Sequence, residues 1–314
     1  MSPVAPSPVT RAANAFVAAH LAEASGLGLR LADLVTAPDD LLRVARMGFA
    51  GLADPEYRDG QIRIAPGIDP VEVVGVRLPL MEAAHRAFKK ATADVSTSLL
   101  LDVAARLLGA QEIELRWFGI WDLGRSLATD PERTWQLLRA AASGATEWIT
   151  IDTLAHPVAE GILREPRRWA ELDRLAYSAD RWERRLVGST IATLPHVRGI
   201  PGAKDETTVA RALGYVERLI GDDEPDVQKA LSWALRNLAA VDQDAVVRLL
   251  EREAAAAAAG DDGHRAWVIR DSLSKIPADK ADTIKAMLEG VRRRPTAPST
   301  SRAAAAAAQL TREA

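Results

Sequence analysis

The stretch "GDDEPDVQKALSWALRNL", residues 221–238, contains the signals that decide the fold. Acidic residues and Pro225 come first, as is common where an α-helix begins. Apolar residues then recur at helical spacing, at Val227, Leu231 and Leu235. One face of the segment would therefore be buried. The stretch predicts an amphipathic helix that packs against other helices.

Similar helix starts recur along the chain. Pro79 precedes "LMEAAHRAF", Asp130 and Pro131 precede "ERTW", and Asp180 with Glu183 has the spacing of a capping box. Extended alternating runs are almost absent. The sequence predicts an all-α protein of about twelve to fourteen helices joined by short turns.

Two tryptophan pairs suggest that the helices repeat. Trp135 and Trp169 are 34 residues apart, and so are Trp148 and Trp182. A period of this length is typical of a repeat of two helices, so we predict a helical-repeat solenoid. An irregular helical bundle is the alternative.

Three segments fall outside this pattern. Residues 54–79 are rich in Pro, Gly and Asp and predict an extended connector. Residues 1–10 are expected to be a flexible N-terminus, and residues 292–314 a disordered tail rich in Ala and Arg. The predicted repeat domain therefore covers residues 11–291.

Composition narrows the class of protein. The chain has 314 residues, no cysteine and a net charge of −3. No apolar run is long enough to cross a membrane, and "MSPVAPSPVT" does not look like a secretory signal, so we expect a cytoplasmic protein. The negative charge argues against a wholly basic surface but allows a local basic groove.

The usual cofactor and metal motifs are missing from the sequence. "SGLGLR" lacks the third glycine and the preceding strand of a dinucleotide loop, and there is no Walker or His-Glu-x-x-His motif. His156 follows Asp152 by one helical turn, but no third metal ligand is nearby. We expect neither a cofactor nor a metal.

The stretch "EWITID", residues 147–152, can be interpreted in two ways. As a strand, it would bury Ile149 and Ile151 on one face. As a helix, it would place Trp148 and Asp152 side by side, one turn apart.

Tryptophan is unusually frequent, with eight Trp among the fifteen aromatic residues. Trp117, Trp121 and Trp135 lie in apolar context and are expected in the core. Three other tryptophans lie within one helical turn of charged residues: Trp148, Trp182 and Trp233. Amphipathic packing explains any one of them, whereas three together favour a binding role.

Arginines are concentrated between residues 164 and 198, where there are eight. A guanidinium suits phosphate oxygens, but it also suits ion pairs on a solvated helix face. Both interpretations stay open for Arg184 and Arg185, which follow Trp182.

Three segments in order resemble the DNA alkylation repair glycosylases built from HEAT-like repeats, the AlkD family. They are "EWITIDTLAHPVAEGIL", "SADRWERRLVGSTI" and "DVQKALSWALRNL". That family has a Trp-x-x-x-Asp helix, then a Trp-x-x-Arg helix, then a Gln-Lys-x-x-x-Trp-x-x-Arg helix. The matching residues are Trp148, Asp152, Trp182, Arg185, Gln228, Lys229, Trp233 and Arg236. "VVGVRLPLMEAA" is similar to the family's Gly-x-x-x-Pro segment, and the likeness spans residues 70–275.

The resemblance implies an all-α HEAT-like solenoid and a monofunctional DNA glycosylase of base excision repair, acting as a monomer. Its partner would be double-stranded DNA carrying N3- or N7-alkylated purines, held without flipping into a pocket. Asp152 would be the catalytic carboxylate, with Trp148 and Trp233 beside the lesion. The implied or candidate DNA-binding residues are Arg184, Arg185, Lys229 and Arg236.

The chemistry of these residue types fits that reaction. An N3- or N7-alkylated purine is cationic and leaves without a general acid, while positive charge builds on the deoxyribose. A carboxylate stabilises that charge and positions water, and Trp faces attract cations. Ile149 stands where many members have Asp, and Glu82 where Arg is frequent. A non-catalytic DNA-binding scaffold and a protein-interaction solenoid are the other hypotheses.

Overall fold

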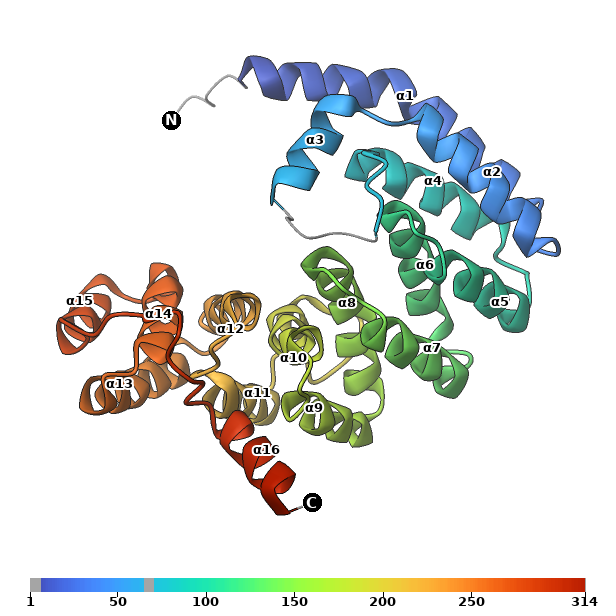
Figure 1. Ribbon diagram of the computed structural model, residues 1–314. Helices are drawn as coiled ribbons and strands as arrows, with labels where there is room; N and C mark the ends of the chain where they lie inside the picture. Colours follow the sequence, from blue (N-terminus) through green and yellow to red (C-terminus); the bar gives the residue numbers. More distant parts are fainter. Residues whose placement is uncertain (1–6, 65–70, 314) are drawn as a thin grey trace. The chain divides into compact units, whose positions relative to one another are not determined.

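The computed structural model describes residues 7–64 and 71–313 (Figure 1). In these ranges the chain forms sixteen α-helices, three short 3₁₀ helices and two isolated β-bridges, without a β-strand. The all-α prediction is confirmed. None of the helices in the described ranges is both long and apolar enough to cross a membrane.

The chain divides into two compact units, Met1–Leu138 and Arg139–Ala314. The helices of the first unit are α1 (Pro8–Ala32), α2 (Pro38–Gly51), α3 (Pro55–Ile64), α4 (Leu78–Ala91), α5 (Thr97–Leu108) and α6 (Ile113–Ser126). Helix α1 packs on α4, and α5 packs on α6. Phe49, Phe88 and Phe118 form ring contacts in the core of this unit.

The prediction of an extended connector over residues 54–79 is wrong in its first part, because Pro55–Ile64 forms helix α3. Asp54 accepts hydrogen bonds from the backbone N–H of Glu56 and Tyr57 at 3.0 and 3.3 Å, so Asp-Pro acts as a helix start. Residues 71–77 are not helical. Residues 65–70 lie outside the described ranges.

Helix α7 (Pro131–Ser143) precedes a regular series in the second unit. That series is α8 (Trp148–Arg164), η1 (Pro166–Arg168), α9 (Trp169–Ala176), α10 (Arg181–Thr193), η2 (Leu194–His196), α11 (Glu206–Leu219), α12 (Pro225–Leu238), α13 (Gln243–Gly260), α14 (Gly263–Ser272), η3 (Leu273–Lys275), α15 (Ala278–Met287) and α16 (Arg302–Glu313). Helices α8, α10, α12 and α14 pack in one row, and α9, α11 and α13 in a second (Figure 1).

This packing is consistent with the predicted helical repeat. Trp148 and Trp182 both occupy the first turn of a helix in the same row, so their spacing reports one helix pair. Helices α10 and α12 approach closely at Gly188, where a Cβ would lie 2.8 Å from the Ala230 Cβ. The close approach fixes α10 between its two neighbours.

The stretch "EWITID" is helical, which settles the choice between strand and helix. Glu147 caps α8 by accepting from the backbone N–H of Ile149 at 2.5 Å and of Thr150 at 3.0 Å. Ile149 and Ile151 are buried. Burial of the β-branched residues and the cap outweigh their modest helix propensity.

The predicted capping box of α10 is half correct. Asp180 accepts from the backbone N–H of Trp182 at 2.6 Å and of Glu183 at 3.3 Å. Glu183 does not return to Asp180: it accepts from the Ser143 hydroxyl at 3.0 Å, while the Asp180 N–H donates to Ser178 Oγ. A side-chain partner on a neighbouring helix has replaced the local one.

The chain termini also differ from expectation. Ser7 caps α1 by accepting from the Thr10 N–H at 3.1 Å, so helix begins inside the segment expected to be flexible; residues 1–6 lie outside the described ranges. In the expected tail, Ala303 is 1% exposed and Thr300 donates its backbone N–H to Gly221 O at 2.9 Å. The sequence did not predict this packing, because the segment has no apolar stripe and is held partly by hydrogen bonds to residues far away in the chain.

Candidate functional site

Trp148 and Asp152 lie one turn apart on α8 and meet α10. The Asp152 carboxylate accepts two hydrogen bonds from Arg185, from Nε to Oδ1 at 3.1 Å and from Nη2 to Oδ2 at 2.7 Å. This is the bidentate fork of a guanidinium on a carboxylate. The Arg185 guanidinium also lies over the Trp148 ring, 5.7 Å from its centroid. The structure therefore brings three predicted site residues together.

A residue absent from the prediction completes this cluster. Ser189, one turn after Arg185 on α10, donates its hydroxyl to Asp152 Oδ1 at 2.6 Å. Ser189 is fully buried, whereas the Asp152 side chain remains 20% exposed. The carboxylate is thus held from within the protein and reachable from outside.

Arg185 is buried rather than projecting from the surface. Its side chain is 6% exposed, and its remaining Nη1 donates to the backbone carbonyl of Asp226 at 2.7 Å. Each of its three nitrogens has an acceptor. In this geometry Arg185 orients Asp152 and ties it to α12, which differs from the implied contact with the DNA backbone.

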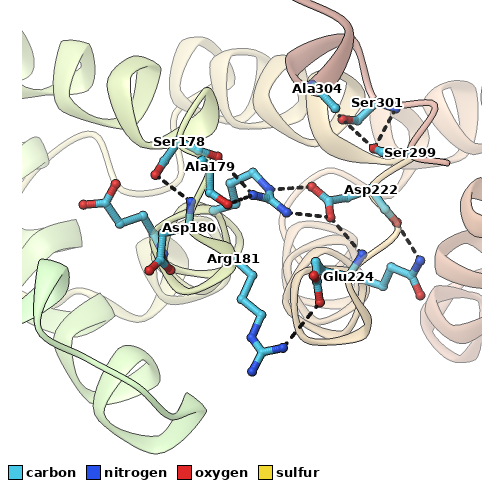
Figure 2. Close-up of polar contacts among 12 residues, drawn as sticks. Ser178, Ala179, Asp180, Arg181, Asp222, Glu224, Ser299, Ser301 and Ala304 are labelled. Carbon is cyan, nitrogen blue, oxygen red and sulfur yellow. Dashed lines mark hydrogen bonds and ion pairs between the residues drawn. The ribbon is translucent and has the colours of Figure 1, made fainter. Parts of the chain in front are cut away.

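Arg184 points elsewhere, although it is the adjacent residue. It forms its own fork with Asp222, at 2.7 and 3.3 Å, and Nη1 donates to the carbonyls of Ser178 and Ala179. Figure 2 shows Asp222 facing the Ser178–Ala179 segment. The Arg184 side chain is 12% exposed, so it serves the junction between α10 and α12 rather than the Asp152 cluster.

Helix α12 carries the other predicted residues on the side that reaches Arg185. Trp233 follows Asp226 by seven residues, which returns it to the same helix face about 10 Å along the axis. Trp233 is half-buried, and Lys229, between the two, is exposed. A ring and a cation therefore share the face of α12 that carries Asp226, the residue that contacts Arg185.

Arg236 has a carboxylate partner that the sequence did not predict. Its Nη1 donates to Asp271 Oδ2 on α14 at 2.7 Å, and the buried Ser232 donates to the same oxygen at 2.5 Å. Burial raises the pKa of Asp271, but the hydrogen bonds from Ser232 and Arg236 outweigh it and lower that pKa overall. Arg236 thus keeps a 28% exposed side chain next to an acid.

A signal for Asp271 was present in the sequence. "WVIRD" places Trp267 four residues before Asp271, the same spacing as Trp148 and Asp152. Ser189 gave no comparable signal, because its acceptor is 37 residues away and serine is common.

Two histidines lie near the cluster. His156 lies on α8 one turn after Asp152. Burial and then the nearby His196 lower the pKa of His156, while the Asp152 charge raises it. His196 itself hydrogen-bonds Asn237 Oδ1 on α12 at 3.2 Å. The His156 ring is therefore close to the charge on Asp152.

A separate pocket of about 260 Å³ lies between α11 and α13. Its polar lining includes Glu206, Glu217, Arg248 and Arg252, and none of its lining residues belongs to α8, α10 or α12. It is distinct from the Asp152 cluster.

Comparison with known proteins identifies the family. A family model named DNA alkylation repair enzyme matches residues 45–276, which is more than half of the 314 residues. A separate comparison with curated proteins found no match. The matched region includes α8, α10 and α12, and hence the whole Asp152 cluster. The chain belongs to the DNA alkylation repair enzyme family.

Proposed function

We propose that this protein is a monofunctional DNA glycosylase that releases cationic N3- and N7-alkylated purines from duplex DNA. The observation that carries the proposal is the Asp152 carboxylate, 20% exposed and held by Arg185 and Ser189 beside the Trp148 ring. A fixed, accessible carboxylate next to an aromatic face suits a reaction that develops positive charge.

The reaction needs little beyond that charge. The C1′–N bond breaks, and the cationic base leaves as a neutral purine with the bonding electron pair. Asp152 stabilises the positive charge left on the deoxyribose, water forms the new C1′–O bond, and its proton passes to solvent. Because the attacking group is water rather than an amine, no Schiff base forms and the product is an intact abasic strand.

The tryptophans supply selectivity for charge. A Trp face attracts a cation by about 0.5–2 kcal/mol, so Trp148 and Trp233 favour the alkylated base and the charged sugar over neutral nucleotides. The expected DNA backbone contacts are Lys229, which is exposed, and Arg236, which retains partial exposure beside Asp271. Contacts to the DNA backbone do not depend on the base sequence.

The proposal is tested by base release from methylated duplex DNA, under single turnover with protein in excess. Asp152→Asn removes the charge with little change of shape, and we expect the rate constant to fall by about 10²–10³-fold. The matched control is Asp222→Asn, because Asp222 forms the same kind of fork with the neighbouring Arg184. Both variants uncouple an arginine fork in the second unit, so thermal unfolding should report losses of stability in both.

Asp222→Asn should keep release near the wild-type rate while folded. Full activity in Asp152→Asn, or equal losses in both variants, would contradict the assigned role of Asp152. Products resolved on a denaturing gel without alkali should be uncut strands, and direct cleavage would contradict the monofunctional mechanism.

A second candidate is a non-catalytic DNA-binding protein on the same fold. The observation that favours it is the fork between Arg185 and Asp152, because a buried arginine can be paired with an acid for structural reasons alone. That candidate expects salt-sensitive binding to duplex DNA without any release of methylated base. The assay above separates the two candidates directly.

A further inference from the structure

We propose that Ser189 is a positioning residue that makes Asp152 Oδ2, rather than Oδ1, the oxygen presented to the substrate. The inference rests on the proposed function and deepens it, because it names the reacting atom and the hydroxyl that selects it.

The two oxygens of Asp152 are not equivalent. A carboxylate oxygen has two in-plane directions in which it can accept hydrogen bonds. Oδ1 accepts from Ser189 Oγ at 2.6 Å and from Arg185 Nε at 3.1 Å, which fills both. In the described structure Oδ2 accepts from Arg185 Nη2 at 2.7 Å, which leaves one direction open.

Arg185 alone cannot make this distinction. A guanidinium fork gives each carboxylate oxygen one hydrogen bond and leaves each with one open direction. The third donor, Ser189, breaks that symmetry and also resists rotation of the carboxylate about its Cβ–Cγ bond. Oδ2 is then the oxygen with an open direction for the substrate.

The position of the Ser189 hydroxyl is fixed by its surroundings. A serine inside a helix commonly donates to the carbonyl four residues earlier. Ser189 instead donates across to α8, although it is fully buried in α10 and Arg185 O lies four residues before it. The preceding Gly188 lets α12 pack directly against this turn, so the backbone that carries Ser189 is held between α12 and α8.

The same arrangement recurs at Asp271, which supports the inference independently. There a buried serine, Ser232, and an arginine, Arg236, both donate to Oδ2 at 2.5 and 2.7 Å. Asp271 also follows a tryptophan by four residues and keeps a 44% exposed side chain. In both clusters, the hydroxyl shares one carboxylate oxygen with the arginine and leaves the other oxygen more open.

The test compares Ser189→Ala with Thr193→Val under single turnover on methylated duplex DNA. Thr193 is also fully buried on α10, and its hydroxyl lies within hydrogen-bond distance of three backbone carbonyls: Thr190 O at 2.9 Å and Ser189 O and Ala155 O at 3.1 Å. Its replacement removes a buried hydroxyl of the same helix, whose acceptors are backbone carbonyls rather than a carboxylate. We expect Ser189→Ala to lower the rate constant about tenfold to a hundredfold with unchanged DNA affinity, and Thr193→Val to match the wild type.

The split between rate and affinity supplies a readout that a general loss of folding would not give. A series of protein concentrations under single turnover separates the maximal rate constant from the half-saturating protein concentration. Ser189→Ala should lower the maximal rate constant and leave the half-saturating concentration unchanged, and Thr193→Val should change neither.

Ser189→Cys, which keeps the volume with a weaker donor, replaces the alanine variant if thermal unfolding shows that the latter does not fold. A Ser189 variant that matches the wild type in its maximal rate constant overturns the role of Ser189 while the proposed function stands. A wild-type protein that releases no methylated base overturns both.

Discussion

Adjacent residues with the same side chain have different surroundings in this protein. Arg184 and Arg185 each form a fork with an aspartate, but successive residues on a helix point about 100° apart. Arg184 joins Asp222 at the α10–α12 junction, and Arg185 joins Asp152. Both arginines follow Trp182, and the sequence alone does not distinguish their roles. Their partners are far away in the chain, Asp222 at 38 residues from Arg184 and Asp152 at 33 residues from Arg185.

How much of the site is predictable from the sequence depends on how far apart the contacting residues are along the chain. Trp148 and Asp152 are a local pair, so helical periodicity alone places them together. The resemblance to a family implied that Arg185 contacts the DNA backbone, whereas the fork between Arg185 and Asp152 is a finding of the structure. Ser189 and Asp271 make their decisive contacts across helices, and no local pattern encodes those contacts.

His85 provides a test of stability against pH at the residue scale. It packs against Phe118 and Trp121 with ring centroids 5.0 and 5.4 Å away, and burial, then Arg125 and Lys89, lowers its pKa to about 4. Between about pH 6.5 and pH 4, His85 therefore binds a proton in the unfolded chain but not in the folded chain. The free energy of unfolding should fall as the pH drops from 6.5 towards 4.

His85→Phe removes this proton uptake while keeping an aromatic ring. The free energy of unfolding of the variant minus that of the wild type should increase by up to about 3 kcal/mol as the pH falls from 7 to 4. Urea unfolding at each pH measures this difference. Asp122, whose pKa burial raises to about 6, is present in both proteins. A difference between the two proteins that is constant with pH would contradict the assignment.

At the scale of elements, helix starts were the most predictable feature and irregular segments the least. Asp180 and Pro225 begin α10 and α12 as expected. Helix α3 was missed although Asp54 and Pro55 are themselves a start signal, because the glycines and prolines that follow dominated the pattern. The packed course of residues 292–313 was missed because it depends on polar partners on other elements.

The C-terminal segment gives a prediction at this scale. Ala297 O accepts from His264 Nε2 at 2.9 Å, Thr300 donates to Gly221 O and to Asp262, and Arg294 pairs with Asp261 at 2.6 Å. Removal of residues 292–314 should lower the unfolding temperature by on the order of 5–10 °C, because several hydrogen bonds are lost.

Gly221→Ala is the matched variant for this truncation. A Cβ at residue 221 would lie 2.8 Å from the Thr300 carbonyl carbon, so the substitution should destabilise the full chain. In the truncated chain it should have little effect, since Thr300 is gone. Additive losses in the two backgrounds would contradict the packed position of the segment.

At the scale of the whole molecule, a net charge of −3 makes the placement of single acids important for binding DNA. Asp271 holds Arg236, one of the proposed contacts to the DNA backbone. Asp271→Asn should release Arg236 for one more phosphate contact. Binding to duplex DNA should tighten at low salt, with the log–log salt dependence steeper by about one.

Asp244→Asn is the control for that experiment. Asp244 is exposed in the first turn of α13, and its replacement changes the net charge by the same amount. Fluorescence anisotropy across a salt series measures both variants. Equal affinities and slopes for the two would show that only net charge matters and would contradict a specific restraint on Arg236.

The central claim is that the accessible carboxylate of Asp152 drives release of the alkylated base. The most direct measurement is the single-turnover rate constant for release of methylated purine by Asp152→Asn relative to Asp222→Asn. We predict a ratio of about 10⁻² to 10⁻³, with Asp222→Asn near the wild type. A ratio near one, or no release by the wild-type protein, would contradict the claim.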